Sequence, residues 1–289
     1  MVTSSAKIVS FWEAFFLNFH LKKVRDPILK TFARKVAACD SKRDSLETLV
    51  LGSSHAQMGW LAGPNEFNLG MSYQDLYHTY HLYKRYADSR SLKKIVVFYS
   101  VFSQGHQLIR TNDAWISATY KVVSNVPWQD SNIATELRLD RLIPSYRRKA
   151  TTYLSSRMPD FAYNGNECSY VPVITRTAAE RATAHFKNSR RAIDMSCFVR
   201  QLINDAALRN QVVYVVVPPV TQAYREALPD GNQIFGELTR KVQTYSNGFC
   251  FNHYGDRSFS KQDFIDWDHL SRVGAEKLTK LVKKEMENV

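Results

Sequence analysis

The chain has 289 residues, 44% of them hydrophobic, which is enough to bury a full core. Its formal net charge of +12 is spread along the chain without a block of like charge, so it favours polyanionic ligands without selecting among nucleic acid, acidic lipid, a nucleotide-bearing cofactor and an acidic glycan. The four cysteines, Cys39, Cys168, Cys197 and Cys250, have no C-x-x-C spacing, which argues against a zinc site and a disulfide framework and predicts free thiols.

The first predicted element is an amphipathic helix that ends near Pro27. A glutamate at position 13 interrupts its apolar run and no basic segment precedes it, which argues against a signal peptide, and the run is too short to span a bilayer. We therefore expect a cytoplasmic protein. The helix either packs on the domain or on a second subunit, which we prefer, or makes a peripheral contact with the inner membrane face. Its apolar positions are Ile8, Phe11, Trp12, Phe15, Phe16 and Phe19.

Short apolar strands then alternate with long helices. Apolar runs predict strands at 49–51, at 94–100, at 212–217 and at 249–251, and a further strand is expected before Phe67. Helical patterns cover about 72–88, 115–157 with a break at a proline, 177–209, and 271–287. The first and third of these begin with predicted capping boxes, Ser72 to Asp75 and Thr177 to Glu180.

This alternation predicts an α/β protein with a parallel sheet covered by helices on both faces, a three-layer α/β/α arrangement of the flavodoxin-like kind. We expect an N-terminal helical segment over residues 1–45 and one domain over 46–289. An irregular helical insertion is expected around 115–170, as a cap over the site.

A candidate nucleophile follows the first strand. Gly52 permits a sharp turn, and Ser54 can then present its hydroxyl at the carboxyl edge of the sheet, where open α/β sheets bind ligands. A serine hydroxyl is a weak nucleophile at neutral pH and needs a base. Taken alone, the turn is ordinary loop material.

A candidate base precedes the last helix, within Asp266-Trp267-Asp268-His269. Asp266 lies three residues before His269 and can hold its Nδ1–H, which leaves Nε2 free to take a proton. Asp268 is adjacent in sequence, is expected to point away, and remains the second candidate. Helix entry with Asp268 or Ser271 as the cap would explain the same residues without catalysis.

Gly70, after the second strand, could bring its N–H close to an oxyanion, or could simply form a turn. Five further histidines are expected to face solvent or to cap helices: His78, His81, His106, His185 and His253.

Three segments, Gly52-Ser53-Ser54-His55, Asn68-Leu69-Gly70 and Asp266-Trp267-Asp268-His269, occur in the order and at the separation of the SGNH/GDSL hydrolase superfamily. The chain resembles this superfamily over about residues 49–282. Within it, the chain is similar to the divergent bacterial group associated with capsule and surface-polysaccharide modification, close to polysaccharide O-acyltransferases. The resemblance implies Ser54 as nucleophile, with Ser53 in place of the usual aspartate. It also implies Gly70 as oxyanion donor, and Asp266 and His269 as the Asp-x-x-His pair.

One block departs from that pattern. The family usually carries a Gly-x-Asn-Asp block after the third strand, whereas residues 100–105 here contain no asparagine. Ser103 or Gln104 could substitute as oxyanion donor, or the oxyanion hole has backbone donors only. His55, beside the nucleophile, could contact substrate.

Three functions fit these residues. We favour an O-acyltransferase that moves an acyl group, acetyl from acetyl-CoA, through an acyl-serine to a bacterial surface or capsular polysaccharide. A carbohydrate esterase or deacetylase would use the same residues, with water as acceptor. A non-catalytic basic protein that binds glycan or nucleic acid is the alternative of another class, although no nucleic-acid motif is present and no such partner is expected. No bound cofactor and no metal are expected.

Overall fold

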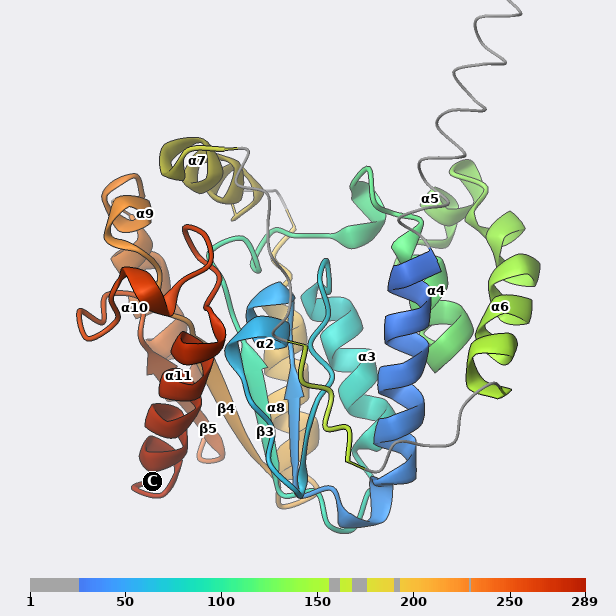
Figure 1. Cartoon of the computed structure of the whole chain (residues 1–289), viewed down its shortest axis with the longest axis horizontal. Helices are drawn as coiled ribbons and strands as arrows, with labels where there is room; N and C mark the ends of the chain where they lie inside the picture. The colour runs from blue at the N-terminus through green and yellow to red at the C-terminus, as the bar shows by residue number, and fades with distance from the viewer. Residues whose placement is uncertain (1–25, 156–161, 168–175, 190–192, 229) are drawn as a thin grey trace, which may run out of the picture.

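A computed structural model describes residues 26–155, 162–167, 176–189, 193–228 and 230–289 (Figure 1). The helix expected over residues 8–25, and with it the question of membrane contact, lies outside this range. Among the described residues, no helix is both long and apolar enough to cross a membrane.

Five parallel strands form the centre of the molecule. They are β1 (Thr48–Leu51), β2 (Glu66–Asn68), β3 (Lys94–Phe98), β4 (Val212–Val217) and β5 (Gly248–Asn252), in the order β2-β1-β3-β4-β5. Short apolar runs form these strands because the side chains on both faces of the sheet are buried away from water. The order reverses between β1 and β3, so a crevice is expected beyond the ends of these two strands. The predicted flavodoxin-like sheet is confirmed.

Helices cover both faces, and alternate strand residues enter two separate cores. Val96 and Phe98 of β3 join the core under α2 (Ser54–Gly59) and α11 (Arg272–Met286). Ile95 and Val97 join the larger core under α3 (Leu76–Tyr86), α8 (Cys197–Ala207) and α10 (Gly231–Val242). This alternation is the period of a strand buried on both sides.

A helix over residues 26–41 belongs to the larger core, although the sequence suggests a separate segment up to residue 45. Leu29, Phe32 and Cys39 are fully buried there. Lys35 is buried as well, and its Nζ donates to the backbone oxygens of Asn68 at 3.2 Å and Gly70 at 2.7 Å. The helix therefore supports the loop that follows β2.

The expected helical insertion contains α4 (Ile116–Ser124), α5 (Ser131–Glu136) and α6 (Ile143–Ser155). The expected break at Pro144 is the start of α6, since proline fits the first turn of a helix. Figure 1 shows α4, α5 and α6 beside the sheet, whereas α7 (Ala178–Ser189) lies above the ends of the strands. The cap is therefore α7.

Two helix predictions need correction. The helix expected over 177–209 is two helices, α7 and α8, although the capping box between Thr177 and Glu180 is present. The box expected at Ser72 is absent, because the backbone N–H and the hydroxyl of Ser72 both donate to Gln57. Asp75 caps α3 instead, by accepting from the backbone N–H of His78. The described cysteines, Cys39, Cys197 and Cys250, are free.

Candidate active site

Ser54 is the first residue of α2 and follows β1 through a tight turn. Gly52 makes this turn possible: its φ is +137°, and a Cβ there would lie 3.0 Å from both the Cβ and the backbone oxygen of Phe98. Ser53 caps α2, and its oxygen is 3.5 Å from the backbone nitrogen of His55. The turn therefore places the Ser54 hydroxyl at the carboxyl edge of the sheet.

The structure brings Ser54, His269 and Asp266 together. Ser54 Oγ is 2.8 Å from His269 Nε2, and His269 Nδ1 is 2.7 Å from Asp266 Oδ2. Asp266 also accepts from the backbone N–H of His269 at 2.7 Å, so one carboxylate holds both the ring and the main chain of that residue. The convergence expected from sequence is confirmed, although Ser54 and His269 are 215 residues apart.

These contacts select one tautomer of His269. The pKa of Asp266 would be raised by its burial, but the hydrogen bond from His269 lowers it below the ordinary value, so Asp266 is an ionised acceptor. Nδ1 must then carry the proton, and Nε2 presents its lone pair to the Ser54 hydroxyl. A serine in this position can lose its proton to the imidazole as it attacks an electrophile.

Asp268 does not point away, which corrects the sequence expectation. Its side chain is 1% exposed, and its Oδ2 lies 3.0 Å from His55 Nε2. Residues 54 and 55 thus contact residues 269 and 268 through two parallel hydrogen bonds. The second bond fixes the nucleophile loop against the base loop independently of the first.

His55 is therefore structural, and its predicted contact with substrate is wrong. Its side chain is 3% exposed, and burial lowers its pKa, so the ring is neutral. Since Asp268 can only accept, Nε2 donates to it and Nδ1 accepts from Ser53 Oγ at 3.3 Å. The Ser53 hydroxyl therefore caps α2 and donates to His55, so it is not available to an oxyanion.

Arg181, on α7, is the residue that the sequence analysis missed. Its Nε donates to Asp268 Oδ1, and its Nη2 lies 3.3 Å from Asp268 Oδ2 and 3.2 Å from His269 Nδ1. Burial opposes its charge, but the attraction of Asp268 raises its pKa. The capping box that starts α7 is the only sequence signal near it. Nothing in one sequence connects an arginine at 181 with an aspartate at 268.

The positive charge of the Arg181 guanidinium partly balances the negative charges of the Asp266 and Asp268 carboxylates. Burial alone would raise the pKa of Asp268, but the hydrogen bond from His55 holds it well below its ordinary range. Because His269 Nδ1 already donates to Asp266, the approach of Arg181 to that nitrogen is an electrostatic contact and not a second hydrogen bond. Arg181 thereby ties the cap helix to the base loop.

The oxyanion donors expected from the sequence are Gly70 and either Ser103 or Gln104, and each has other contacts in the structure. The N–H of Gly70 donates to Asn68 Oδ1 at 2.9 Å, and this glycine allows close packing on α2, since a Cβ there would lie 2.6 Å from the Cβ of Ala56. Ser103 Oγ accepts from the backbone of Ser100. Gln104 lines a different cavity, between α8 and α10. The structure contradicts the predictions for Gly70 and Gln104. Ser103 only accepts a hydrogen bond, so its own O–H can still donate, and its role stays a prediction. The backbone N–H of Ser54, at the start of α2, makes no hydrogen bond within the described structure and is a further candidate.

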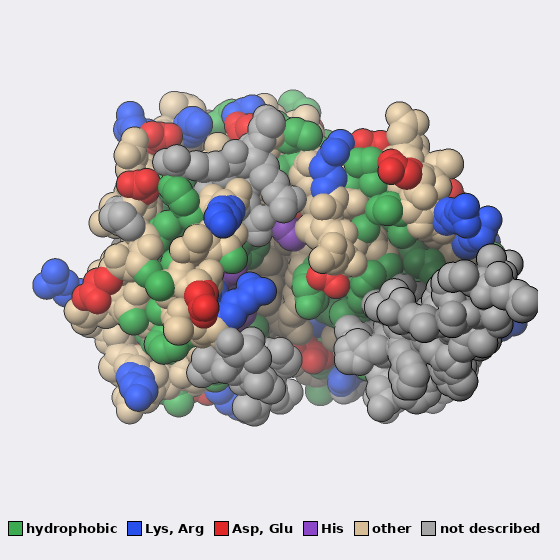
Figure 2. Space-filling model, turned by 90° about the horizontal axis from the view of Figure 1, so that it is seen from above, with side chains coloured by type: hydrophobic (Ala, Val, Ile, Leu, Met, Phe, Trp, Pro, Cys, Tyr) green, Lys and Arg blue, Asp and Glu red, His purple; other side chains and the backbone are tan. Residues whose placement is uncertain are grey.

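Three of the histidines expected at the surface are largely buried. His78 Nδ1 lies 2.7 Å from Asp75 Oδ1, and His253 Nε2 lies 3.1 Å from Glu285. His185 Nδ1 lies 2.7 Å from the hydroxyl of Tyr224, behind Asp268, and burial lowers its pKa to about 3. Figure 2, a view onto this edge of the sheet, shows histidine atoms in a hollow near the centre of the face.

The site does not fit a metal ion. Among the described residues, His55, Asp268 and His269 offer ligand atoms that all lie within 4.8 Å of one another. Each of these side chains already has a hydrogen-bond partner in the cluster, and the Arg181 guanidinium contacts Asp268. A cation would have to displace or face this positive charge.

Fold and site together define a parallel α/β protein with a serine, a histidine and an aspartate in hydrogen-bonded series at the carboxyl edge of its sheet. No family model and no curated protein matches the chain. Solved structures do match, among them a protein from Streptococcus pneumoniae named for platelet activating factor. It is 12% identical, with a TM-score of 0.42 over 98% of this chain and 99% of that one. A similarity this low carries no argument about activity.

Proposed function

We propose that the chain is an SGNH-type serine acyltransferase. The observation that carries the proposal is the series Ser54 Oγ, His269 Nε2 and Nδ1, Asp266 Oδ2, with successive contacts of 2.8 and 2.7 Å. This is the geometry of a nucleophile, its base and the group that orients the base. The Gly-Ser-Ser-His and Asp-x-x-His segments, at the positions that resemble this superfamily, support the same assignment.

In the first half-reaction, His269 Nε2 takes the proton of Ser54 as Oγ attacks the carbonyl carbon of a thioester. The carbon–sulfur bond then breaks, and the thiolate leaves with the proton from His269. The negative charge that forms on the carbonyl oxygen can accept a hydrogen bond from the backbone N–H of Ser54. Asp266 stabilises the imidazolium between the two proton transfers.

In the second half-reaction, a hydroxyl of the acceptor attacks the acyl-serine, with His269 again as base and then as acid to Ser54. We propose acetyl-CoA as donor and a bacterial polysaccharide as acceptor, on the resemblance and on a net charge of +12 that attracts phosphates and acidic sugars. With a sugar ester as acyl donor and water as acceptor, the same residues would act as a carbohydrate esterase.

Mass spectrometry of the intact protein after incubation with acetyl-CoA tests the first step. We expect one acetyl group, located on Ser54 by peptide mapping and absent from Ser54→Ala. Free thiol release with and without polysaccharide then separates the two activities. Release that requires both the glycan and Ser54 supports the transferase. Equal release without glycan supports hydrolysis, and an acetyl-free Ser54 together with no thiol release contradicts the transferase.

A further inference from the structure

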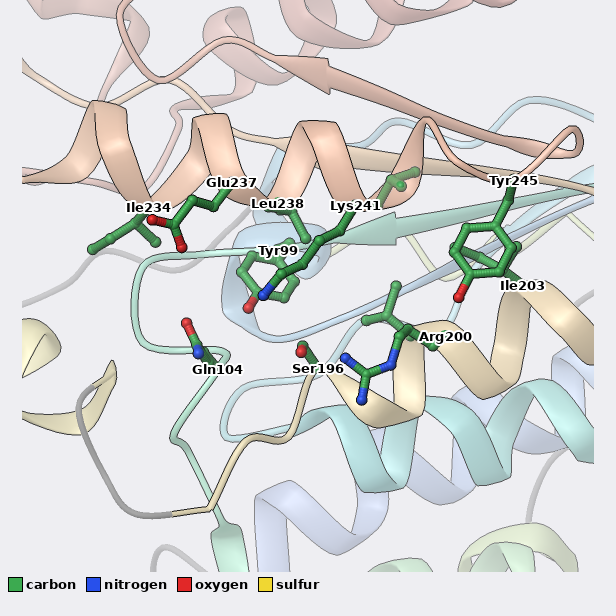
Figure 3. Close-up of a pocket in the computed structure, with 12 residues that line it drawn as sticks. Tyr99, Gln104, Ser196, Arg200, Ile203, Ile234, Glu237, Leu238, Lys241 and Tyr245 are labelled. Atoms are coloured by element: carbon green, nitrogen blue, oxygen red, sulfur yellow. The ribbon is translucent and has the colours of Figure 1, made fainter.

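A second cavity lies on the larger helical face of the sheet, between α8 and α10 (Figure 3). The space between the two helices is about 460 Å³, most of which is open to solvent. Neither Ser54 nor His269 lines it, so the proposed acyl chemistry does not account for it. The apolar walls come from two helices: Val199 and Ile203 of α8, and Ile234, Leu238 and Val242 of α10.

Two hydroxyl groups at this cavity make no hydrogen bond within the described part of the chain, and that of Ser196 is buried. Ser196 is 8% exposed, and its Oγ makes no hydrogen bond, although as N-cap of α8 it could have capped that helix. Tyr99, just after β3, is 2% exposed, and its hydroxyl makes no hydrogen bond to any described residue. A buried hydroxyl without a partner is unfavourable, so Ser196 Oγ gains from a ligand that accepts a hydrogen bond, and the Tyr99 hydroxyl can donate to the same ligand.

Charged side chains reach the same space. Figure 3 shows Arg200 on α8 and Lys241 on α10 directed into the gap between the helices, with Glu237 also at its edge. Arg200 has only a long contact, of 3.9 Å, with Asp194. Lys241 has no ion pair among the described residues, although Glu237 is one turn away on the same helix. The charged residues that line the cavity therefore carry two positive charges against one negative charge.

We propose that this cavity, the α8–α10 pocket, binds a small organic anion that consists of an apolar body and one carboxylate or similar anionic group. The apolar walls take the body. Lys241, Arg200 and the two hydroxyls donate to the anionic group, and Glu237 disfavours a second negative charge. The site is separate from the proposed catalytic residues and holds whether or not Ser54 is a nucleophile.

Fluorescence titration with anilinonaphthalene sulfonate, an aromatic body with one anionic group, tests this proposal on the full chain. Lys241→Gln should raise the Kd about tenfold, the value of one charge-assisted hydrogen bond at a half-open site. Arg240→Gln is the matched control, because this exposed neighbour on α10 does not line the pocket. Glu237→Gln should lower the Kd about threefold through the loss of a like charge.

Three results would overturn the proposal: no binding by the wild-type chain, equal Kd values for Lys241→Gln and Arg240→Gln, or an increase of Kd in Glu237→Gln. Ser196→Ala should weaken binding without changing the melting temperature by more than a few degrees. Ser54→Ala should leave the Kd unchanged. A change in the Kd of Ser54→Ala would place the dye in the catalytic hollow and refute the assignment.

Discussion

The buried pair of Asp268 and Arg181 allows a sharp test, because its two partners differ in exposure. The side chain of Asp268 is 1% exposed, whereas that of Arg181 is 24% exposed. Arg181→Met leaves a buried carboxylate with His55 as its remaining close donor, and losing one partner of a buried pair costs about 3–5 kcal/mol. Asp268→Asn leaves a cation that water can reach, so we expect about 1–3 kcal/mol.

The double variant removes both charges, so its loss in the free energy of unfolding should be smaller than the sum of the single losses by about 2 kcal/mol. Urea unfolding followed by circular dichroism measures all four proteins. Arg110→Met is the matched control, since the pair of Arg110 with Asp130 is half-exposed and worth at most about 1 kcal/mol. Additive losses, or equal losses for Arg181→Met and Arg110→Met, would refute the view that Arg181 compensates a buried charge.

Three further predictions follow from the site. Asp266→Asn should slow acylation of Ser54 by roughly four orders of magnitude, because the wrong tautomer of His269 is then favoured. Asp268→Asn should slow acylation far less when rates are compared at equal folded fraction. Mass spectrometry measures both rates, and the reverse ranking would show that the orienting carboxylate is misassigned. His55 and His185 have folded pKa values below 6.5, so the unfolded state binds more protons as the pH falls, and the free energy of unfolding should drop by about 2 kcal/mol from pH 7 to 5.5. His185→Gln should remove about half of this drop, and an unchanged slope would contradict a neutral buried ring. Gly52→Ala should cost at least about 1–3 kcal/mol from backbone strain alone, measured as a lower midpoint of urea unfolding, and a wild-type midpoint would mean that the turn can relax.

The sequence by itself determined the strands, the order of the layers and the two loops of the site. Short apolar runs rich in β-branched residues, such as Val212–Val217, predict buried strands, and a serine directly after the first strand of a parallel sheet lies at its carboxyl edge. Asp266 could be paired with His269 because the two are three residues apart, and local geometry alone brings them into contact.

Tertiary structure decided everything that depends on distant partners. Arg181 and Asp268 meet only because α7 folds over the edge of the sheet, and His55 is turned inward by the same carboxylate. The N–H of Gly70 is taken by Asn68, a bond that depends on the path of the chain after β2. A single sequence contains the residue types of such contacts but not their distances, because burial and charge compensation are set by packing between elements far apart in the chain.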